Sequence, residues 1–262
     1  TAIFFSSYPY VLGQLYLPEN NDKNSSSDNP DIFTNDIFIR AYFLSQSLDL
    51  SISRVKDNEY LDDIDYEPAY CDKAGIEVNI NSFGISFYNT LSNTREEIKL
   101  QGKSEFTDIW LTFYTGDFGI ELLYQKYNGF HLSYPEEHGY HEGDPETKRP
   151  DLKMRNIGGR FYYNLLELNK YSIAANFNQT EKHRDCLAIA FLAMVSFDYS
   201  TFDSDYSLIT PDMEAKYDKY SGLTDGKMVS LALSPGLAAS ISALNIYATT
   251  ALFIGGGYQN VQ

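Results

Sequence analysis

The chain has 262 residues and a formal net charge of −16, with 36 acidic residues against 20 Lys and Arg. This length allows one large domain with a sizeable interior. The acidic balance argues against a nucleic-acid partner, because no basic stripe is present to replace the counterions of a phosphate backbone. Aromatic residues reach 15%, with 22 Tyr and 17 Phe. Such an excess is typical of the aromatic girdles of outer-membrane β-barrels, although a Tyr-rich soluble β-sandwich is an alternative.

Apolar and polar residues alternate with a period of two along most of the chain, which predicts β-strands. Residues 1–35 include the polar stretch 20–31 and are expected to form a partly mobile N-terminal segment. From there the alternation predicts strands at 36–45, 47–55, 74–81, 83–91, 104–116, 118–128, 152–166, 170–179, 185–199, 227–238 and 244–257. No segment shows a sustained helical period or an apolar run of ~18 residues, so no transmembrane helix is expected.

The clearest hairpin lies at 107–127, where two alternating runs meet at a Gly116-Asp117 turn. Ile109 and Leu111 share one face of the first run, and Ile120 and Leu122 share the same face of the second. Alternation on both sides of a tight turn that contains Gly is typical of a β-hairpin with one apolar face.

Short and long connections alternate between the predicted strands, and the long ones are 56–73, 92–103 and 129–151. A transmembrane barrel requires this alternation, because its periplasmic turns are short and its extracellular loops are longer. The long connection 200–226 breaks the pattern, and an added strand at 206–210 restores it. The sequence therefore predicts an all-β fold, an antiparallel up-and-down transmembrane β-barrel of about twelve strands over residues 36–262, in a bacterial outer membrane.

The two faces of the predicted strands differ in polarity. The inward, polar face collects Arg40, Glu121, Gln125, Asn156, Arg160, Asn164, Asn176 and Asn178. The outward, apolar face collects Ile37, Ile39, Phe43, Ile109, Leu111, Phe118, Ile120, Phe161, Tyr163, Leu165, Ile173 and Phe177. A soluble barrel has the inverse arrangement. Arg40, Glu121 and Arg160 are expected to pair across the lumen, because unpaired charges are too costly to bury.

Two groups of residues have types that suit chemistry. His138 and His141 lie among carboxylates and form a weak candidate for a zinc-like cation, but their loop offers no rigid scaffold, and a solvated loop is the favoured interpretation. His183 is a candidate base for a lipid-modifying enzyme, but no Ser nucleophile motif accompanies it. The sequence therefore predicts a protein that is not an enzyme and needs no cofactor.

Three blocks follow one another in a recognisable order: KSEFTDIWLTFYTGDFGIELLYQKYNGFHL (103–132), RPDLKMRNIGGRFYYNL (149–165) and YSIAANFNQTE (171–181). The first contains Tyr124, Tyr127, Gly129, Phe130 and Leu132 in a Y-x-x-Y-x-G-F-x-L pattern. Over residues 36–257 the chain resembles the bacterial family of domain of unknown function 4421. This resemblance implies an outer-membrane-type β-barrel from a Bacteroidetes-like or related bacterium, and it implies no activity and no catalytic residues.

The expected function is that of a structural or accessory subunit of an envelope complex, with a polar and largely occluded lumen. Its expected partners are outer-membrane lipid, lipopolysaccharide and other envelope proteins. One alternative is a narrow channel or uptake barrel in which Arg40, Glu121 and Arg160 select a small solute. Another is a soluble lipocalin-like binder, whose apolar face would point inward.

Overall fold

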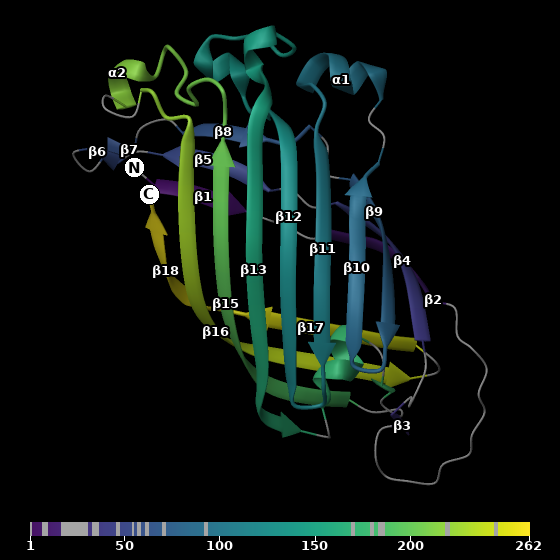
Figure 1. The fold of residues 1–262 in the computed structure, drawn as a ribbon. Helices are drawn as coiled ribbons and strands as arrows, with labels where there is room; N and C mark the ends of the chain where they lie inside the picture. The colour runs from purple at the N-terminus through teal and green to yellow at the C-terminus, as the bar shows by residue number, and fades with distance from the viewer. Residues whose placement is uncertain are drawn as a thin grey trace.

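One large antiparallel sheet dominates the computed structural model, and Figure 1 shows its strands side by side in a curved wall. Along its main path the strands follow the order β17 (Ile246–Phe253), β16 (Asp225–Ala243), β15 (Leu187–Asp203), β13 (Lys148–Leu168), β12 (Phe118–Leu132), β11 (Glu105–Tyr114), β10 (Phe83–Thr90), β9 (Asp72–Ile80), β4 (Ile37–Ser45) and β2 (Tyr10–Tyr16). The structure describes residues 2–6, 10–16, 31–32, 37–45, 48–53, 55–56, 59–60, 63–69, 72–91, 94–168, 171–178, 181–182, 187–217, 221–243 and 246–262.

Shorter strands join this sheet away from its main path. β18 (Gly256–Val261) pairs with β16, β8 (Ile64–Glu67) pairs with the end of β12, and β5 (Asp49–Ser53) pairs with both β8 and β1 (Ala2–Ser6). Two separate pairs are β3 (Asp31–Ile32) with β14 (Glu181–Lys182), and β6 (Val55–Lys56) with β7 (Glu59–Tyr60). Strands β1 and β2 come from the first 35 residues, so part of the N-terminal segment is built into the sheet.

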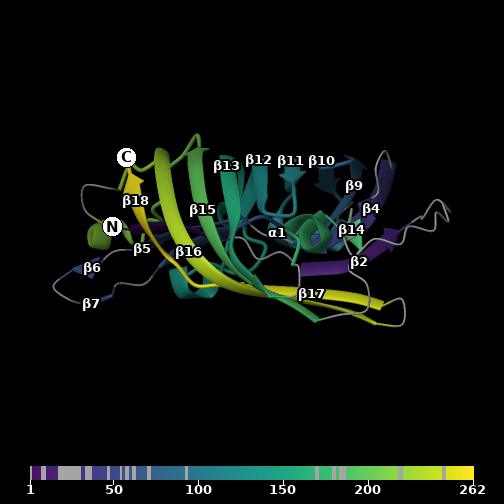
Figure 2. The same ribbon diagram turned by 90° about the horizontal axis from the view of Figure 1, so that it is seen from below.

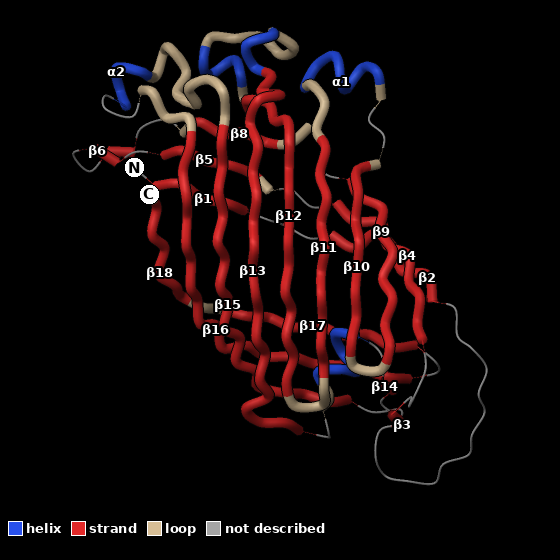
Figure 3. The backbone as a smooth tube through the Cα atoms, in the orientation of Figure 1, coloured by secondary structure: helices blue, strands red, loops and turns tan. Residues whose placement is uncertain are grey.

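The two ends of the sheet differ in their connections (Figure 3). At one end, called the long-loop end, the connections carry α1 (Arg95–Gln101), η1 (Pro135–His138), η2 (Pro145–Thr147) and α2 (Glu214–Tyr217). At the opposite turn end, β10 follows β9 and β12 follows β11 after tight turns at 81–82 and 115–117. Helix α1 begins at a capping box, in which Thr94 accepts from the Glu97 backbone and the Glu97 side chain accepts from the Thr94 backbone.

The predicted large antiparallel sheet is confirmed, but its closure is not. In the described part of the chain, the main path ends at β2, which pairs with β4, and at β17, which pairs with β16. The 14-stranded sheet therefore forms a strongly curved wall and not a closed barrel, as the view from below in Figure 2 illustrates. Within the described residues, no helix has the length and apolar character needed to cross a membrane.

Two predicted strands are wrong, at 170–179 and 206–210. Ala174–Asn178 is the π-helix η3, and the Ile173 and Ala174 backbone amides donate to the Gly116 and Thr115 carbonyls, at 3.0 and 2.9 Å. Ile173 is fully buried and Phe177 packs beside it, so their predicted outward position is also wrong. At 206–210 no strand forms, and residues 208–210 are all buried, so buried and exposed side chains do not alternate there.

These two corrections are linked. Without a strand at 170–179, the chain leaves β15 at the long-loop end, where the connection 204–224 lies beside the other long loops (Figure 1). The alternation of short turns and long loops therefore needs no added strand at 206–210. The long connection 200–226 would break the alternation only if residues 170–179 formed a strand, and they do not.

The sheet's outer face, which bears Leu122, is apolar and exposed, whereas its inner face, which bears Glu121, is buried. Large apolar side chains on the outer face that are at least one-third exposed include Ile39, Phe43, Ile76, Ile80, Phe83, Phe87, Leu111, Leu122, Ile157, Phe161, Tyr163, Phe197, Leu231 and Leu233. The period-two alternation of strand side chains separates the two sets, because successive residues point to opposite faces.

Two apolar clusters occupy the ends of the inner face. The loop-end cluster packs β5 and β8 against the sheet, and the turn-end cluster packs the segment around η3 against it. Along β13, Leu152 and Met154 belong to the loop-end cluster and Tyr162 belongs to the turn-end cluster. Asn156 and Arg160 lie between them in the sequence of this strand. A polar layer is therefore enclosed between two apolar ones.

Gly119 gives a test of the packing at the turn end. It pairs in register with Tyr114, and a methyl group at Gly119 would lie 2.6 Å from Tyr114 Cδ1 and 3.2 Å from Ile173 Cγ2. We expect Gly119→Ala to lower the free energy of unfolding by about 1–3 kcal/mol, because the buried ring must move. Thermal unfolding followed by circular dichroism measures the change.

Gly159→Ala is the matched control. Gly159 lies on the outer face of β13, and the nearest atom to an added methyl group is Leu122 Cδ2 at 3.5 Å, an ordinary contact. This variant should be as stable as the wild type or slightly more so, since alanine restricts the unfolded chain. Equal unfolding midpoints for the two variants would contradict the tight packing of Tyr114 over Gly119.

Candidate functional site

Charged and amide side chains occupy the middle of the sheet's inner face, and they form the candidate site. We call them the interior polar network, which consists of Arg40, Lys73, Glu77, Asn79, Asp108, Glu121, Gln125, Asn156, Arg160 and Ser200. All except the half-buried Arg160 are at most 7% exposed. Burial on this scale is stable only if the charges are paired and the polar atoms are hydrogen-bonded.

Lys73 on β9 is fully buried. Its ammonium group donates hydrogen bonds to the Asp108 carboxylate and to the Tyr127 hydroxyl. It also lies over the rings of Phe106 and Tyr127, at 4.7 and 4.9 Å from their centroids. A carboxylate, a hydroxyl and two aromatic faces therefore replace the water that the ammonium group loses on burial.

A row of hydrogen bonds continues from Asp108 across the sheet. Gln125 Nε2 donates to Asp108 Oδ2 at 3.3 Å, and Asn156 Nδ2 donates to Gln125 Oε1 at 3.1 Å. Ser200 Oγ then donates to Asn156 Oδ1 at 2.9 Å. These four residues are successive register partners on β11, β12, β13 and β15. The strand register alone therefore brings residues far apart in sequence into one polar row.

Glu121 is the acceptor of a second group nearer the turn end. It accepts from the hydroxyls of Tyr114 and Tyr162, the latter at 3.0 Å, and Arg160 Nη1 lies 3.4 Å from its Oε2. Glu121 and Arg160 are register partners on β12 and β13. The Arg160 guanidinium lies 5.4 Å from the Trp110 ring centroid, which adds a cation–π contact.

A third group lies at the β4–β9 pair. Arg40 Nη1 lies 3.6 Å from Glu77 Oε1, and the two residues are register partners. Glu77 also accepts from the Tyr42 hydroxyl and from Asn79 Nδ2, the latter at 2.7 Å. Each of the carboxylates Glu77, Asp108 and Glu121 thus has a basic partner within the network.

A cavity of about 120 Å³ opens between the second and the first groups. It is lined by Leu48, Gln125, Asn156, Arg160, Asp198, Ser200, Met228 and Ser230. Water molecules or a solute of a few atoms fit this volume, and the polar lining offers them both donors and acceptors. The site can hold small polar groups, and it places no nucleophile beside a histidine base.

The structure brings together most of the residues that the sequence assigned to the lumen. Glu121, Gln125, Asn156 and Arg160 lie in the two central groups, and Arg40 lies in the third. Asn164 lies further along β13, where its backbone amide donates to the Asp117 carbonyl at 2.9 Å. Asn176 and Asn178 are part of η3, and their side chains lie outside the described residues.

Sequence reasoning missed Lys73, Glu77 and Asp108. Glu77 and Asp108 alternate with outward residues on predicted strands, and this alternation is the signal that assigns both side chains to the polar face. Lys73 fell within a predicted loop, because β9 begins at Asp72 and not at residue 74. Its burial depends on acceptors from β11 and β12, which the local sequence does not reveal.

The candidate metal and catalytic histidines lie apart from the network. His138 is buried in η1 with Nδ1 3.4 Å from Asp212 Oδ2, whereas the His141 side chain is exposed. Among the residues that the structure describes, no group of three His, Cys, Asp or Glu is arranged to hold a metal ion. His183 lies outside the described residues.

The R-P-D-L block has a structural role at the long-loop end. Arg149 donates to Asp151 through Nε at 3.0 Å and Nη2 at 2.8 Å, and to the carbonyls of Tyr206 and Ser207 at 2.7 and 2.9 Å. Partial burial favours the neutral carboxyl, but hydrogen bonds and charge from Arg149 outweigh it and hold the pKa of Asp151 below its usual range. Together the two side chains fix the loop 204–224 to the start of β13.

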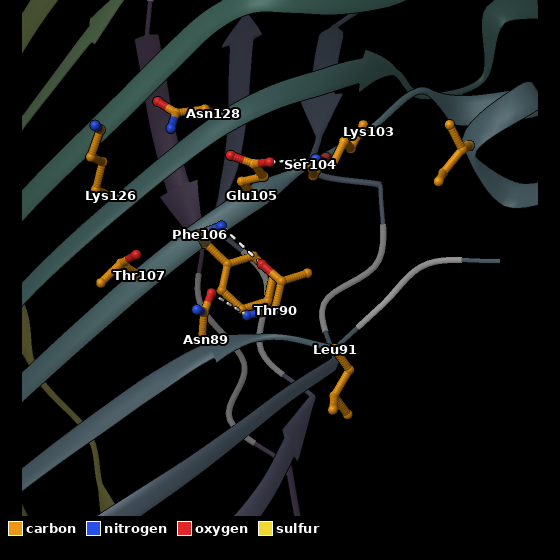
Figure 4. A pocket seen from close by; sticks show the side chains of 11 residues that line it. Asn89, Thr90, Leu91, Lys103, Ser104, Glu105, Phe106, Thr107, Lys126 and Asn128 are labelled. Atoms are coloured by element: carbon orange, nitrogen blue, oxygen red, sulfur yellow. Dashed lines mark hydrogen bonds and ion pairs between the residues drawn. The ribbon is translucent and has the colours of Figure 1, made fainter. Parts of the chain in front are cut away.

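A polar pocket of about 730 Å³ lies beside α1 at the same end (Figure 4). Its lining consists of Asn89, Thr90, Leu91, Ile98, Lys103, Ser104, Glu105, Phe106, Thr107, Lys126 and Asn128. Lys103 and Glu105 form an ion pair at 2.5 Å, and the Phe106 backbone amide donates to Thr90 Oγ1 at 3.0 Å. The pocket is separate from the interior polar network. Phe106 lines the pocket, and its ring also contacts Lys73 of the network.

The Lys73–Asp108 pair gives a test of the network. We expect Lys73→Ala to lower the free energy of unfolding by about 3–5 kcal/mol, because it leaves a buried carboxylate without its counter-charge. The double variant Lys73→Met, Asp108→Leu removes both charges and should recover most of this loss. Denaturant unfolding of the purified protein measures both changes. A single variant as stable as the wild type would contradict a charged, dry pair at this position.

Comparisons with known proteins give a family and no nearer relative. The model of the domain of unknown function DUF4421 matches residues 31–261. No curated protein and no solved structure matches the chain. The family match covers most of the sheet, from β4 to β18, and includes every residue of the interior polar network. The chain therefore belongs to the DUF4421 family.

Proposed function

We propose that this chain is an integral outer-membrane β-barrel protein with an occluded polar interior, which serves as a structural or accessory subunit of an envelope complex. The sheet would close into a barrel in the membrane, and the outer face would contact lipid. In this proposal no side chain carries out covalent chemistry, and no cofactor takes part.

The observation that carries the proposal is the inverted polarity of the sheet. Leu122 is 52% exposed on the outer face, whereas the neighbouring Glu121 is 7% exposed on the inner face. The same contrast extends over adjacent strands, and monomeric soluble proteins rarely expose a continuous apolar patch of this extent. Lipid chains are the solvent in which such a face is stable.

The dimensions of the apolar face support a spanning role. On β13 its outward residues run from Ile157 to Leu165, which corresponds to about 26 Å along the strand at ~3.3 Å per residue. The apolar band of transmembrane barrels is ~25 Å tall. Towards the turn end, Phe83, Phe113, Phe118 and Phe161 form a run of ring contacts with centroids 4.6, 5.8 and 6.3 Å apart. An aromatic belt of this kind suits a membrane boundary.

The arrangement of the interior supports an occluded barrel and not an open channel. The loop-end and turn-end clusters lie on either side of the polar layer, and the cavity within that layer is about 120 Å³. The network's carboxylates are held by basic side chains and tyrosine hydroxyls. Side chains that form ion pairs and hydrogen bonds with one another in this way stabilise the interior and do not line a wide aqueous path.

The long-loop end supports a role as a subunit. Exposed apolar side chains there include Ile98 and Leu100 on α1, together with Tyr134 and Tyr206 on the long loops. Aromatic and aliphatic side chains of this kind are suited to contacts with another envelope protein.

Cell fractionation with a heat-modifiability gel tests the location and the closure. We expect the protein in the outer-membrane fraction, and we expect the unheated sample to migrate faster than the boiled one because a closed barrel stays compact in detergent. Recovery in the soluble fraction would contradict the proposal. Recovery in the membrane without a mobility difference would retain the location and refute the closure.

The substitution Leu122→Lys tests whether the outer face contacts lipid. Leu122 pairs with Gly159, one row from the Ile157 edge of the apolar band and one row from its centre. A lysine there should cost about 1–3 kcal/mol in a bilayer, because the penalty falls from ~2–4 kcal/mol at the midplane to ~0–1 kcal/mol at the interfaces, whereas on a surface exposed to water it changes stability by about 0.5 kcal/mol or less. Thr107→Lys, two rows nearer the long-loop end, should cost only about 0–1 kcal/mol. Unfolding in lipid vesicles measures both. Equal, small effects would indicate that water covers this face.

A further inference from the structure

A row of basic residues borders the apolar band on the outer face, at its long-loop side. Successive register partners along this row are Asn89, Thr107, Lys126, Arg155, Thr201 and Lys227, on β10, β11, β12, β13, β15 and β16. Three of the six are basic and none is acidic. The next row towards the turn end is already part of the apolar band and contains Phe87, Ile109, Tyr124, Ile157, Tyr199 and Val229.

The three basic side chains are available to a ligand. Arg155 and Lys227 are exposed, Lys126 is partly exposed, and none of the three forms an ion pair with another described residue. Acidic residues of the outer face begin one row further towards the loops, with Glu105, Asp203 and Asp225. In a chain with a net charge of −16, a row of three cations without an acid is a local reversal of charge.

The polar pocket beside α1 extends this row at one end. Its wall includes Asn89, Thr107 and Lys126, which are the first three members of the row, and Figure 4 shows them on neighbouring strands. Asn128 adds a further donor to the same pocket, whereas Lys103 is paired there with Glu105. A volume of about 730 Å³ accommodates a polar headgroup while the attached chains lie along the apolar rows below it.

We propose that the row Lys126, Arg155 and Lys227, together with the pocket beside Lys126, binds the phosphate groups of anionic lipids at the long-loop boundary of the membrane. Charge complementarity carries this assignment, because cations that line a polar–apolar boundary attract phosphates that are not neutralised by their own ammonium group. Tyr124 and Tyr199, one row below, lie where aromatic rings meet headgroups. The inference rests on the proposed function, since it requires the outer face to be embedded in lipid.

The test uses the full chain in mixed vesicles of phosphatidylcholine and phosphatidylglycerol. Native mass spectrometry then counts the two lipids that stay bound after extraction. The wild type should retain phosphatidylglycerol in excess of its share of the mixture, by about fivefold for one bound site. The variant Lys126→Gln, Arg155→Gln, Lys227→Gln should retain the two lipids in the mixed ratio, and high salt should weaken the wild-type preference.

The matched control removes the same charge elsewhere. Arg95→Gln, Lys99→Gln, Lys216→Gln alters exposed residues on α1 and α2 and should keep the wild-type preference. Loss of the preference in this control as well would overturn the inference, because net charge alone would then explain the binding. Lys126→Gln alone should give a partial loss, and it keeps the test decisive if the triple variant does not fold.

Insertion into pure phosphatidylcholine vesicles separates the two proposals. If the wild type enters these vesicles but retains both lipids in the mixed ratio, the lipid-binding row is refuted and the membrane proposal stands. If the wild type does not enter them, the proposed function is contradicted, and the lipid-binding inference falls with it.

Discussion

The strand register of the antiparallel sheet is the constraint on which the other features depend. It joins residues of neighbouring strands into continuous rows, so that Asp108, Gln125, Asn156 and Ser200 form one polar row on the inner face. On the turn side of this row, the outward residues Ile109, Tyr124, Ile157 and Tyr199 form an equally continuous apolar row. A slip of one residue between two strands would exchange the faces and place charges such as Glu121 on the apolar side. The burial of charge therefore fixes the register as strongly as the burial of apolar surface does.

The inner face is stable because its charges are balanced locally and enclosed by apolar groups. Lys73, Arg160 and Arg40 each face a carboxylate on a neighbouring or nearby strand, and tyrosine hydroxyls supply further donors. The loop-end cluster is completed by β5 and β8, and the turn-end cluster by the segment around η3. Because segments outside the main path of the sheet complete these two clusters, the chain itself fills both ends of the interior. This filling supports the architectural role that we propose.

On the outer face, the basic row of Lys126, Arg155 and Lys227 borders the apolar rows at their long-loop side. The two faces of one strand thus use charge differently, since Gln125 faces the enclosed network while the next residue, Lys126, belongs to the outward row. The long-loop end then adds the Arg149–Asp151 clamp, which holds the loop 204–224 against β13. The carboxylates of the interior polar network are paired with basic side chains, whereas the cations of the basic row lie at the edge of the apolar band without an ion pair to another described residue.

Alternation in the sequence determined most of the strands and the polarity of their two faces, because side-chain direction in a strand depends only on residue parity. It identified Arg40, Glu121, Gln125, Asn156 and Arg160 as inward residues, and the blocks at 103–132 and 149–165 indicated the family. Only the tertiary structure placed the Lys73 ammonium group beside the rings of Phe106 and Tyr127, because its partners lie on other strands. Only the tertiary structure separated η3 from the strands. Ile173 and Phe177 alternate in sequence with Asn176 and Asn178, but residues 171–175 are all buried, and the Ile173 and Ala174 amides bind the 115–117 turn. Local periodicity determines which way a side chain points, whereas long-range packing decides what it meets.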